Sequence, residues 1–262
     1  MWTENSQGNR VKRANSSRKR LGETRWPMAI SESREIEKFD RCAKTYNELM
    51  DASVRFSGED WRYFAEYKIT CLKRFGYGKT TRVLDFGCGT GNLTSLLCDH
   101  FGEVAGIDPA CESLARAREV ASRATFWSHP DMAPDSHFDV SVLAGVLHHV
   151  PLADRVCVVK QAMSKLRVNG RIVVFEHNPM NPLTRIAVEK CQFDDDAVLL
   201  RPSEVRSVLL SAGCSDIRQD YIVFFPKCLA WFRSLELHLR WLPVGAQTLT
   251  TAILNQNSPM IS

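Results

Sequence analysis

One segment constrains the fold of this chain more than any other: Val83-Leu84-Asp85-Phe86-Gly87-Cys88-Gly89-Thr90-Gly91. An apolar run reaches Asp85, and three glycines then follow at alternate positions. Glycine adopts left-handed backbone conformations without strain and lets another group approach the backbone closely. Such a loop is typical of the point where a strand of an open α/β sheet meets its helix, which is where these sheets bind ligands.

The hydrophobic pattern from Thr81 onward alternates between short apolar strands and longer amphipathic helices. This alternation predicts an α/β fold, with a doubly wound, mostly parallel seven-stranded sheet and helices on both faces. The predicted strands cover residues 82–86, 104–107, 124–127, 138–143, 171–176, 217–225 and 247–254. The predicted helices cover residues 92–99, 111–122, 152–166, 203–212 and 229–242. A turn at Asn169-Gly170 is expected to end the third of these helices.

The 262 residues divide into four predicted regions. Residues 1–29 are a basic tail, and residues 30–78 are an N-terminal helical lid with amphipathic helices over 32–50 and 59–75. Residues 79–256 form the main ligand-binding domain, and residues 257–262 are a C-terminal tail. The chain is long enough to bury a sizeable core without disulfide bonds.

The N-terminal tail carries the charge imbalance of the chain. Residues 1–30 hold seven Lys and Arg against two Glu, an excess of five positive charges, whereas the whole chain has a net charge of +4. Their polar composition predicts disorder. Three interpretations stay open: an arm that binds nucleic acid or anionic lipid, a solvated segment without a role, or a natural start at Met28.

Cysteine usage and hydropathy suggest the compartment. The nine cysteines are scattered, and neither a CxxC pair nor a Cys/His cluster with zinc spacing occurs. The sequence therefore predicts reduced cysteines and no metal site. No apolar stretch reaches the roughly 18 residues that a membrane span needs, and the N-terminus has no apolar signal core, so a cytoplasmic protein is expected.

The acid before the glycine loop distinguishes between two kinds of cofactor. A dinucleotide-binding loop has the pattern GxGxxG and places a pyrophosphate at the helix N-terminus, but here Asn92 stands where the last glycine would be. The carboxylate of Asp85 would repel a pyrophosphate and attract an ammonium group. S-adenosylmethionine has such an ammonium and no phosphate. Asp108, which ends the next strand, fits a ribose diol in either cofactor, and its alternative role is to cap the following helix.

Three segments resemble the class I S-adenosylmethionine-dependent methyltransferases, in particular the small-molecule branch. They are residues 83–91, residues 104–109, and the run from Phe138 to Val150 with its Leu147-His148-His149 motif, followed by a helix and 166–171. The resemblance covers about residues 81–254 and implies the Rossmann-like methyltransferase fold, with S-adenosylmethionine as cofactor. A narrower likeness, over residues 175–184, is to a bacterial subgroup associated with surface-glycan or secondary-metabolite pathways.

The resemblance also implies the cofactor-binding residues. Asp85 and the loop glycines would hold the methionine part, Asp108 the ribose hydroxyls, and Asp131 the adenine amino group, although the stretch around Asp131 departs from the family pattern. Leu143, Ala144 and Gly145 would line the floor beside the sulfonium. The full predicted set is Asp85, Phe86, Gly87, Cys88, Gly89, Gly91, Asp108, Pro109, Asp131, Leu143, Ala144, Gly145 and His148.

His149 and His177 are the candidate catalytic residues. Both follow strands close to where the transferred methyl group should lie, and histidine titrates near neutral pH. A general base would help if the acceptor is a hydroxyl, and would add little for a carbon or amine nucleophile. The alternative is a structural role, in which these histidines hydrogen-bond their own loops.

The absence of certain motifs narrows the chemical class of the methyl acceptor. Neither an Asn/Asp-Pro-Pro-Tyr/Phe motif nor a Pro-Cys nucleophile follows the fourth strand, so DNA-base methylation is disfavoured. The favoured acceptor is a small molecule or a lipid- or glycan-linked compound, methylated at oxygen. The apolar segment 224–243, with its basic residues, predicts either a membrane-docking surface or lid, or a helix packed on the sheet. An RNA methyltransferase using the basic tail, and a cofactor-binding protein without turnover, stay as alternatives.

Overall fold

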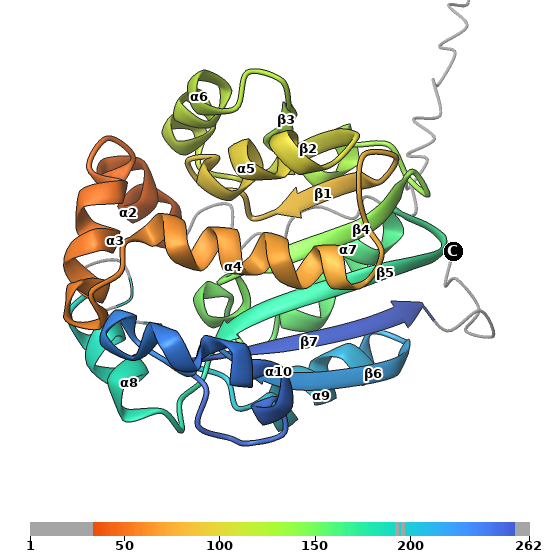
Figure 1. Ribbon diagram of the computed structural model, residues 1–262. Coiled ribbons are helices and arrows are strands. Elements are labelled where there is room, and N and C mark those ends of the chain that lie inside the picture. Colours follow the sequence, from red (N-terminus) through yellow and green to blue (C-terminus); the bar gives the residue numbers. More distant parts are fainter. Residues whose placement is uncertain (1–33, 192–193, 195–196, 255–262) are drawn as a thin grey trace, which may run out of the picture.

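A seven-stranded sheet forms the centre of the structure, a computed structural model that describes residues 34–191, 194 and 197–254 (Figure 1). The strand order is β3-β2-β1-β4-β5-β7-β6, and strands β1 to β5 are parallel whereas β7 runs antiparallel to both neighbours. This confirms the predicted fold class. The strands are β1 Arg82–Phe86, β2 Glu103–Ile107, β3 Thr125–Trp127, β4 Phe138–Ala144, β5 Leu166–His177, β6 Cys214–Ile222 and β7 Gln247–Leu254.

Helices cover both faces of the sheet. α4 and α5 pack on one face, where Leu72 and Leu97 join Val140 in the core. α7 and α9 pack on the other face, where Val159 and Val205 join Ile172. The α-helices are α2 Arg34–Cys42, α3 Tyr46–Val54, α4 Trp61–Arg74, α5 Asn92–His100, α6 Cys111–Val120, α7 Arg155–Ser164, α8 Pro182–Glu189, α9 Pro202–Ser211 and α10 Glu236–Leu239. Short 3₁₀ helices are η1 Arg55–Ser57, η2 Pro130–Met132, η3 Leu147–His149 and η4 Lys227–Leu235.

The alternation of side chains along β1 decides which residues reach the site. Val83 lies in the core beneath α4 and α5, whereas Leu84 and Phe86 lie in the core beneath α7 and α9. Successive side chains of a strand point to opposite faces, so Asp85 shares its face with Val83. The carboxylate therefore lies on the side of the sheet that α4 covers.

The N-terminal helices differ from the prediction. The helix expected over residues 32–50 is two helices, α2 and α3, separated by a turn at 43–45 in which Thr45 N–H donates to the Cys42 carbonyl. The helix expected over 59–75 is confirmed as α4, which begins at an N-cap where Asp60 accepts from Tyr63 N–H. α2 and α3 lie together at the end of the sheet toward which β1 points (Figure 1).

Two further predictions were wrong around β5 and η4. Asn169-Gly170 does not end a helix: it lies inside β5, where Asn169 has φ of 62° and the pairing with β4 shifts register between Phe138 and Val140. A Cβ on Gly170 would lie 2.8 Å from the Arg167 carbonyl oxygen, so the glycine is required by this close approach. The helix expected over 229–242 is replaced by η4 and the short α10, because Leu229 leaves helical geometry (φ −115°, ψ 22°).

One helix, α8, was missed. Asn181 caps it by accepting from the N–H groups of Leu183 and Thr184, and Pro182 occupies its first turn. Asn-Pro ahead of an apolar-periodic segment is a helix-start signal that the sequence did contain.

Several expectations concern parts of the chain that the structure does not describe. The tail predicted over 1–29, the start of the first predicted helix and the C-terminal tail 257–262 lie outside the described residues. Within the described residues, no helix combines the length and the apolar character needed to cross a membrane.

Candidate active site

A cavity of about 360 Å³ lies at the carboxyl ends of the central parallel strands. The loops after β1, β2 and β4 and the end of β5 form one side, and residues of α2, α3 and α4 form another. Most of its lining is apolar, and aromatic side chains contribute much of it: Phe39, Tyr46, Phe64, Phe224 and Phe225. Open α/β sheets bind their ligands at this edge, so the cavity is the candidate active site.

The glycine loop has the backbone geometry that only glycine adopts easily. Gly87, Gly89 and Gly91 have φ values of 81°, 51° and 78°. A Cβ on Gly87 would lie 2.6 Å from a Val146 methyl carbon, and one on Gly91 would lie 2.8 Å from the Cα of Ala117. A Cβ on Gly89 would meet nothing within 4 Å, although Gly89 lines the cavity. Two glycines are therefore needed for packing, and Gly89 leaves room for a ligand.

Two carboxylates flank this loop. Asp85 is buried and its Oδ2 accepts from the Thr94 hydroxyl at 2.7 Å. Asp108 accepts from Gly89 N–H at 2.8 Å and from Ala110 N–H at 2.9 Å. Burial raises the pKa of Asp85 to about 7 and that of Asp108 to about 6. Asp108 thus ties the loop to the end of β2 and is not the N-cap of α6, a position that Ala110 occupies.

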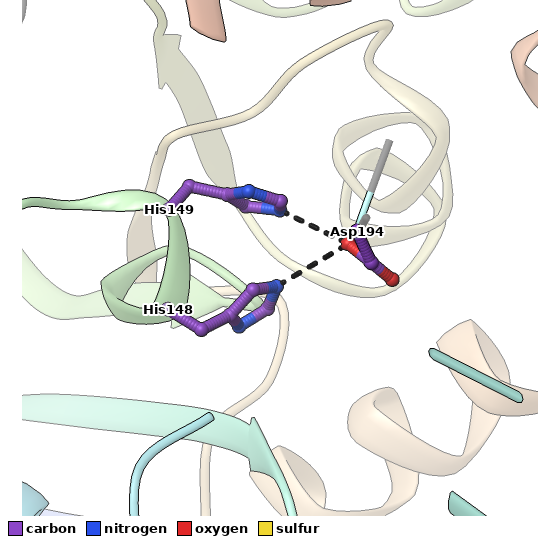
Figure 2. Close-up of side chains that lie close together, drawn as sticks. All are labelled: His148, His149 and Asp194. Carbon is purple, nitrogen blue, oxygen red and sulfur yellow. Dashed lines mark ion pairs between the residues drawn. The ribbon is translucent and has the colours of Figure 1, made fainter. Parts of the chain in front are cut away.

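A cluster of histidines and carboxylates occupies the side of the cavity that follows β4. η3 places His148 and His149 next to each other, with ring centroids 4.1 Å apart. Nε2 of His149 lies 3.2 Å from Oδ1 of Asp194, and Nε2 of His148 lies 3.6 Å from the same oxygen. Figure 2 shows both rings directed at this carboxylate from adjacent positions of one loop.

Glu176 holds the cluster from the other side. Its Oε2 lies 2.6 Å from His148 Nδ1, and its Oε1 accepts from Leu147 N–H at 2.8 Å. Although burial opposes the charged imidazolium, Glu176 and Asp194 raise the pKa of His148 to about 10. Burial also opposes charge on Asp194, but the two histidines hold its pKa well below the usual range.

His177 has a different electrostatic environment. It lines the same cavity, and its ring centroid lies 5.2 Å from that of His148. Burial and the neighbouring His148 lower the pKa of His177 to about 4. His177 is therefore neutral at physiological pH and is a weak base.

The cavity brings together most of the predicted site residues. It is lined by Asp85, Gly87, Cys88, Gly89, Asp108, Pro109, Ala144, Gly145, His148, His149 and His177. Gly91 lies beneath the loop as the N-cap of α5.

Besides Gly91, three predicted residues do not line the cavity. Phe86 and Leu143 are fully buried in the core on the opposite face of the sheet, because their strand positions point away from Asp85. Asp131 lies in η2, where its N–H donates to His129 Nδ1, and its carboxylate is 49% exposed. The lining of this cavity therefore does not include the side chains expected at its floor (Leu143) and at the adenine amino group (Asp131).

The sequence analysis missed many of the lining residues, among them the ionisable side chains Glu176, Asp194, Tyr46 and Lys68. Glu176 lies in the predicted fifth strand beside His177, which was the only signal for it. Asp194 lies in a stretch without periodicity, and Tyr46 and Lys68 were read as ordinary helix residues. Burial lowers the pKa of Lys68 to about 8, so this amine is unusually easy to deprotonate.

Comparisons with known proteins agree with this geometry. Residues 84–172 match the model of a family described as "Methyltransferase domain". An uncharacterized methyltransferase of Staphylococcus carnosus is 32% identical over 143 residues, covering 54% of this chain and 67% of that protein. A 2-phytyl-1,4-naphtoquinone methyltransferase of Synechococcus elongatus is 31% identical over 160 residues, covering 56% of this chain and 65% of that protein. The matches thus span about two thirds of the length of these relatives.

A solved structure shares the fold. The crystal structure of a SAM-dependent methyltransferase from Archaeoglobus fulgidus superposes with a TM-score of 0.59 at 16% identity, covering 79% of this chain and 99% of that one. At this identity the likeness concerns the fold alone.

Proposed function

Since this chain belongs to the class I S-adenosylmethionine-dependent methyltransferase family, we propose that it transfers a methyl group to the oxygen of a small-molecule or lipid- or glycan-linked acceptor. One observation carries the proposal: a single cavity contains both a glycine loop flanked by carboxylates and a cluster of histidines that suits hydroxyl activation. The two features lie at the ends of neighbouring strands, β1 and β4, which pair in the sheet.

The residues around the loop fit the family's cofactor. Asp85 offers a buried carboxylate to an ammonium group, and the open space at Gly89 lets a ligand reach the backbone. Asp108 already accepts two backbone hydrogen bonds, but each carboxylate oxygen has a second lone pair for a ribose hydroxyl. S-adenosylmethionine supplies a methyl group on a positively charged sulfur that leaves as a neutral thioether. The protein's part is to hold donor and acceptor in line, which alone is worth up to about 7–11 kcal/mol.

His149 is the better of the two candidate bases. Its Nε2–H is directed at Asp194, and this arrangement leaves the lone pair of the neutral ring on Nδ1. The edge-to-face contact with Phe39, at 4.9 Å between ring centroids, restricts the ring further. His177, with a pKa of about 4, is poorly suited to accept a proton at neutral pH, and its proposed role is to position the acceptor.

The apolar lining supports an acceptor with apolar or aromatic parts. Phe39, Phe64 and Phe225 line the same cavity as the histidines, and Phe39 contacts the His149 ring. The relative named for a phytyl naphthoquinone is an example of a methyltransferase with an apolar ring substrate. The segment 227–241 follows the lining residues Phe224 and Phe225 along the chain and carries two exposed tryptophans, Trp231 (77%) in η4 and Trp241 (74%) just after α10. We therefore also propose that this segment contacts membranes when the acceptor is lipid-linked.

The RNA alternative has no support among the described residues, since its basic arm is residues 1–29.

The test of the proposed function is release of S-adenosylhomocysteine over a panel of hydroxylated metabolites, quinols and glycolipids. Turnover should appear with at least one acceptor, and it should be strongly reduced in Asp85→Asn, through weaker donor binding, and in His149→Ala. His137→Ala is the matched control. His137 forms a comparable pair with Glu103, with 2.8 Å between Nε2 and Oε1, and it does not line the cavity. Donor binding without turnover on any acceptor would favour the non-catalytic alternative.

A further inference from the structure

We propose that His148, His149 and Asp194 bind a divalent transition-metal ion, and that this ion binds the acceptor's hydroxyl oxygen. The inference rests on the proposed function and deepens it, because it assigns a second activating group to the acceptor end of the cavity. No metal site was expected from the sequence, in which Asp194 follows His148 and His149 by 46 and 45 residues.

The donor atoms already have nearly the right separations. One ligand atom from each of the three side chains lies within 4.8 Å of the other two. The distances from Asp194 Oδ1 to the two Nε2 atoms are 3.2 and 3.6 Å. Metal–nitrogen bonds of about 2.1 Å place neighbouring ligand atoms about 3.0–3.4 Å apart, so only a small inward movement of the rings is required.

The orientation of His148 matches that of a metal-binding histidine. Ligating histidines usually donate their second N–H to a carboxylate, which fixes the ring and directs the other nitrogen to the metal. His148 has this arrangement, because its Nδ1 lies 2.6 Å from Glu176 and its Nε2 faces Asp194. Glu176 is itself held by Leu147 N–H. The tautomer that binds metal is thus set by a buried hydrogen bond.

Charge supports a cation at this place. Glu176 and Asp194 are both buried, at 2% and 9% exposure, in a cavity with a mainly apolar lining. Two buried carboxylates require positive charge beside them, and a divalent ion that replaces the proton on Nε2 of His148 supplies two positive charges. Two imidazoles with one carboxylate are a donor set that suits Zn²⁺ or Fe²⁺ and not the all-oxygen sites of Mg²⁺ or Ca²⁺.

Three protein ligands leave positions for the acceptor. His148, His149 and Asp194 all line the cavity, so an ion held between them has coordination positions left for an acceptor bound in that cavity. A bound hydroxyl becomes more acidic and loses its proton to solvent water. Its oxygen lone pair then forms the bond to the methyl carbon, while the carbon–sulfur bond breaks and leaves its electron pair on sulfur. In this arrangement His149 is a ligand, and the ion performs the activation otherwise assigned to it.

Metal binding is tested on the full chain without a polyhistidine tag. The protein is treated with chelator and titrated with Co²⁺, whose visible absorption reports its ligands, and then with Zn²⁺ as competitor. We expect one equivalent of Co²⁺ to bind and Zn²⁺ to displace it. Asp194→Asn and His149→Ala should lower the affinity at least 10-fold, and Glu176→Gln about 10–100-fold. His137→Ala should bind as the wild type does, and thermal unfolding verifies that each variant is folded.

The results separate this proposal from the proposed function. Absence of stoichiometric Co²⁺ binding, or equal binding by wild type and Asp194→Asn, would overturn the metal site. Full turnover by chelator-treated protein would also overturn it, while leaving methyl transfer and His149 as base intact. Loss of turnover on chelation, restored by metal in the wild type but not in Asp194→Asn, would support it. Metal binding by the three residues without turnover on any acceptor would uphold the site and contradict the proposed function.

Discussion

The substitution Asp85→Asn should have opposite effects on donor binding and on stability. The carboxylate is buried beside the Thr94 hydroxyl, in a region that also contains Asp108 and Lys68, and burial raises its pKa to about 7. A hydrogen bond to a charged partner contributes about 1.5–3 kcal/mol, so we expect the affinity for S-adenosylhomocysteine to fall about 10- to 150-fold at pH 8. The same change removes a charge whose burial is costly, so the ligand-free variant should unfold at a higher temperature than the wild type at pH 8.

The pH dependence of donor binding follows from the same group. The donor's ammonium favours ionised Asp85, so affinity is full above pH 7 and is lost as the pH falls through 7. With a pKa of about 7, ionised Asp85 falls from about 90% at pH 8 to about 10% at pH 6, which predicts about a tenfold loss of affinity. The stability of the ligand-free protein changes in the opposite direction with pH. Because the pKa of Asp85 is higher in the folded than in the unfolded chain, its contribution to stability is full below the unfolded-state pKa and is lost as the pH rises toward 7.

Isothermal titration calorimetry with S-adenosylhomocysteine between pH 6 and 8.5 measures the pH dependence of donor affinity. Thermal unfolding of the ligand-free proteins over the same range measures the pH dependence of stability. Asp108, whose pKa is about 6, titrates in both the wild type and Asp85→Asn. The difference between the two pH profiles therefore reports the ionisation of Asp85. The reasoning is refuted if wild type and variant have the same pH profile, or if the variant binds the donor as tightly as the wild type at pH 8.

The remaining predictions concern the loop, the histidines and the exposed aromatic segment. Gly87→Ala should lower the free energy of unfolding by about 1–3 kcal/mol, because its Cβ would clash at positive φ. Gly89→Ala should instead reduce donor binding more than stability. Chemical denaturation measures the stability of both variants, and calorimetry measures their donor affinity. His149→Ala should lower kcat about 10²–10⁴-fold on a hydroxyl acceptor, and His177→Ala should mainly raise KM; equal effects on kcat would contradict the assigned roles. Trp231→Ser should weaken co-flotation with anionic lipid vesicles, and failure of the wild type to float would remove the membrane contact.

Prediction from the sequence succeeded where the signal is local. The strands around the glycine loop and the helix after it were placed within a residue or two. The hydrophobic periodicity of a strand or helix and the glycines with positive φ depend only on residues that are adjacent in the sequence. It failed at 43–45 and around Leu229, where local geometry departs from an apolar periodicity that continues across it. Asn169-Gly170 is a related case, since pairing with β4 made a typical turn signal part of a strand.

The sequence by itself determined the donor end of the site: an acid before three glycines, followed by an acid one strand later. Only the tertiary structure decided the acceptor end. Asp194 reaches His149 from 45 residues further along the chain, and Glu176 reaches His148 across paired strands. No spacing in the sequence records such contacts, because they depend on which strands pair and on which side chains the sheet directs to the same face. The glycine loop follows from the conformational preference of its own residues, whereas the histidine–carboxylate cluster exists only once the sheet has formed.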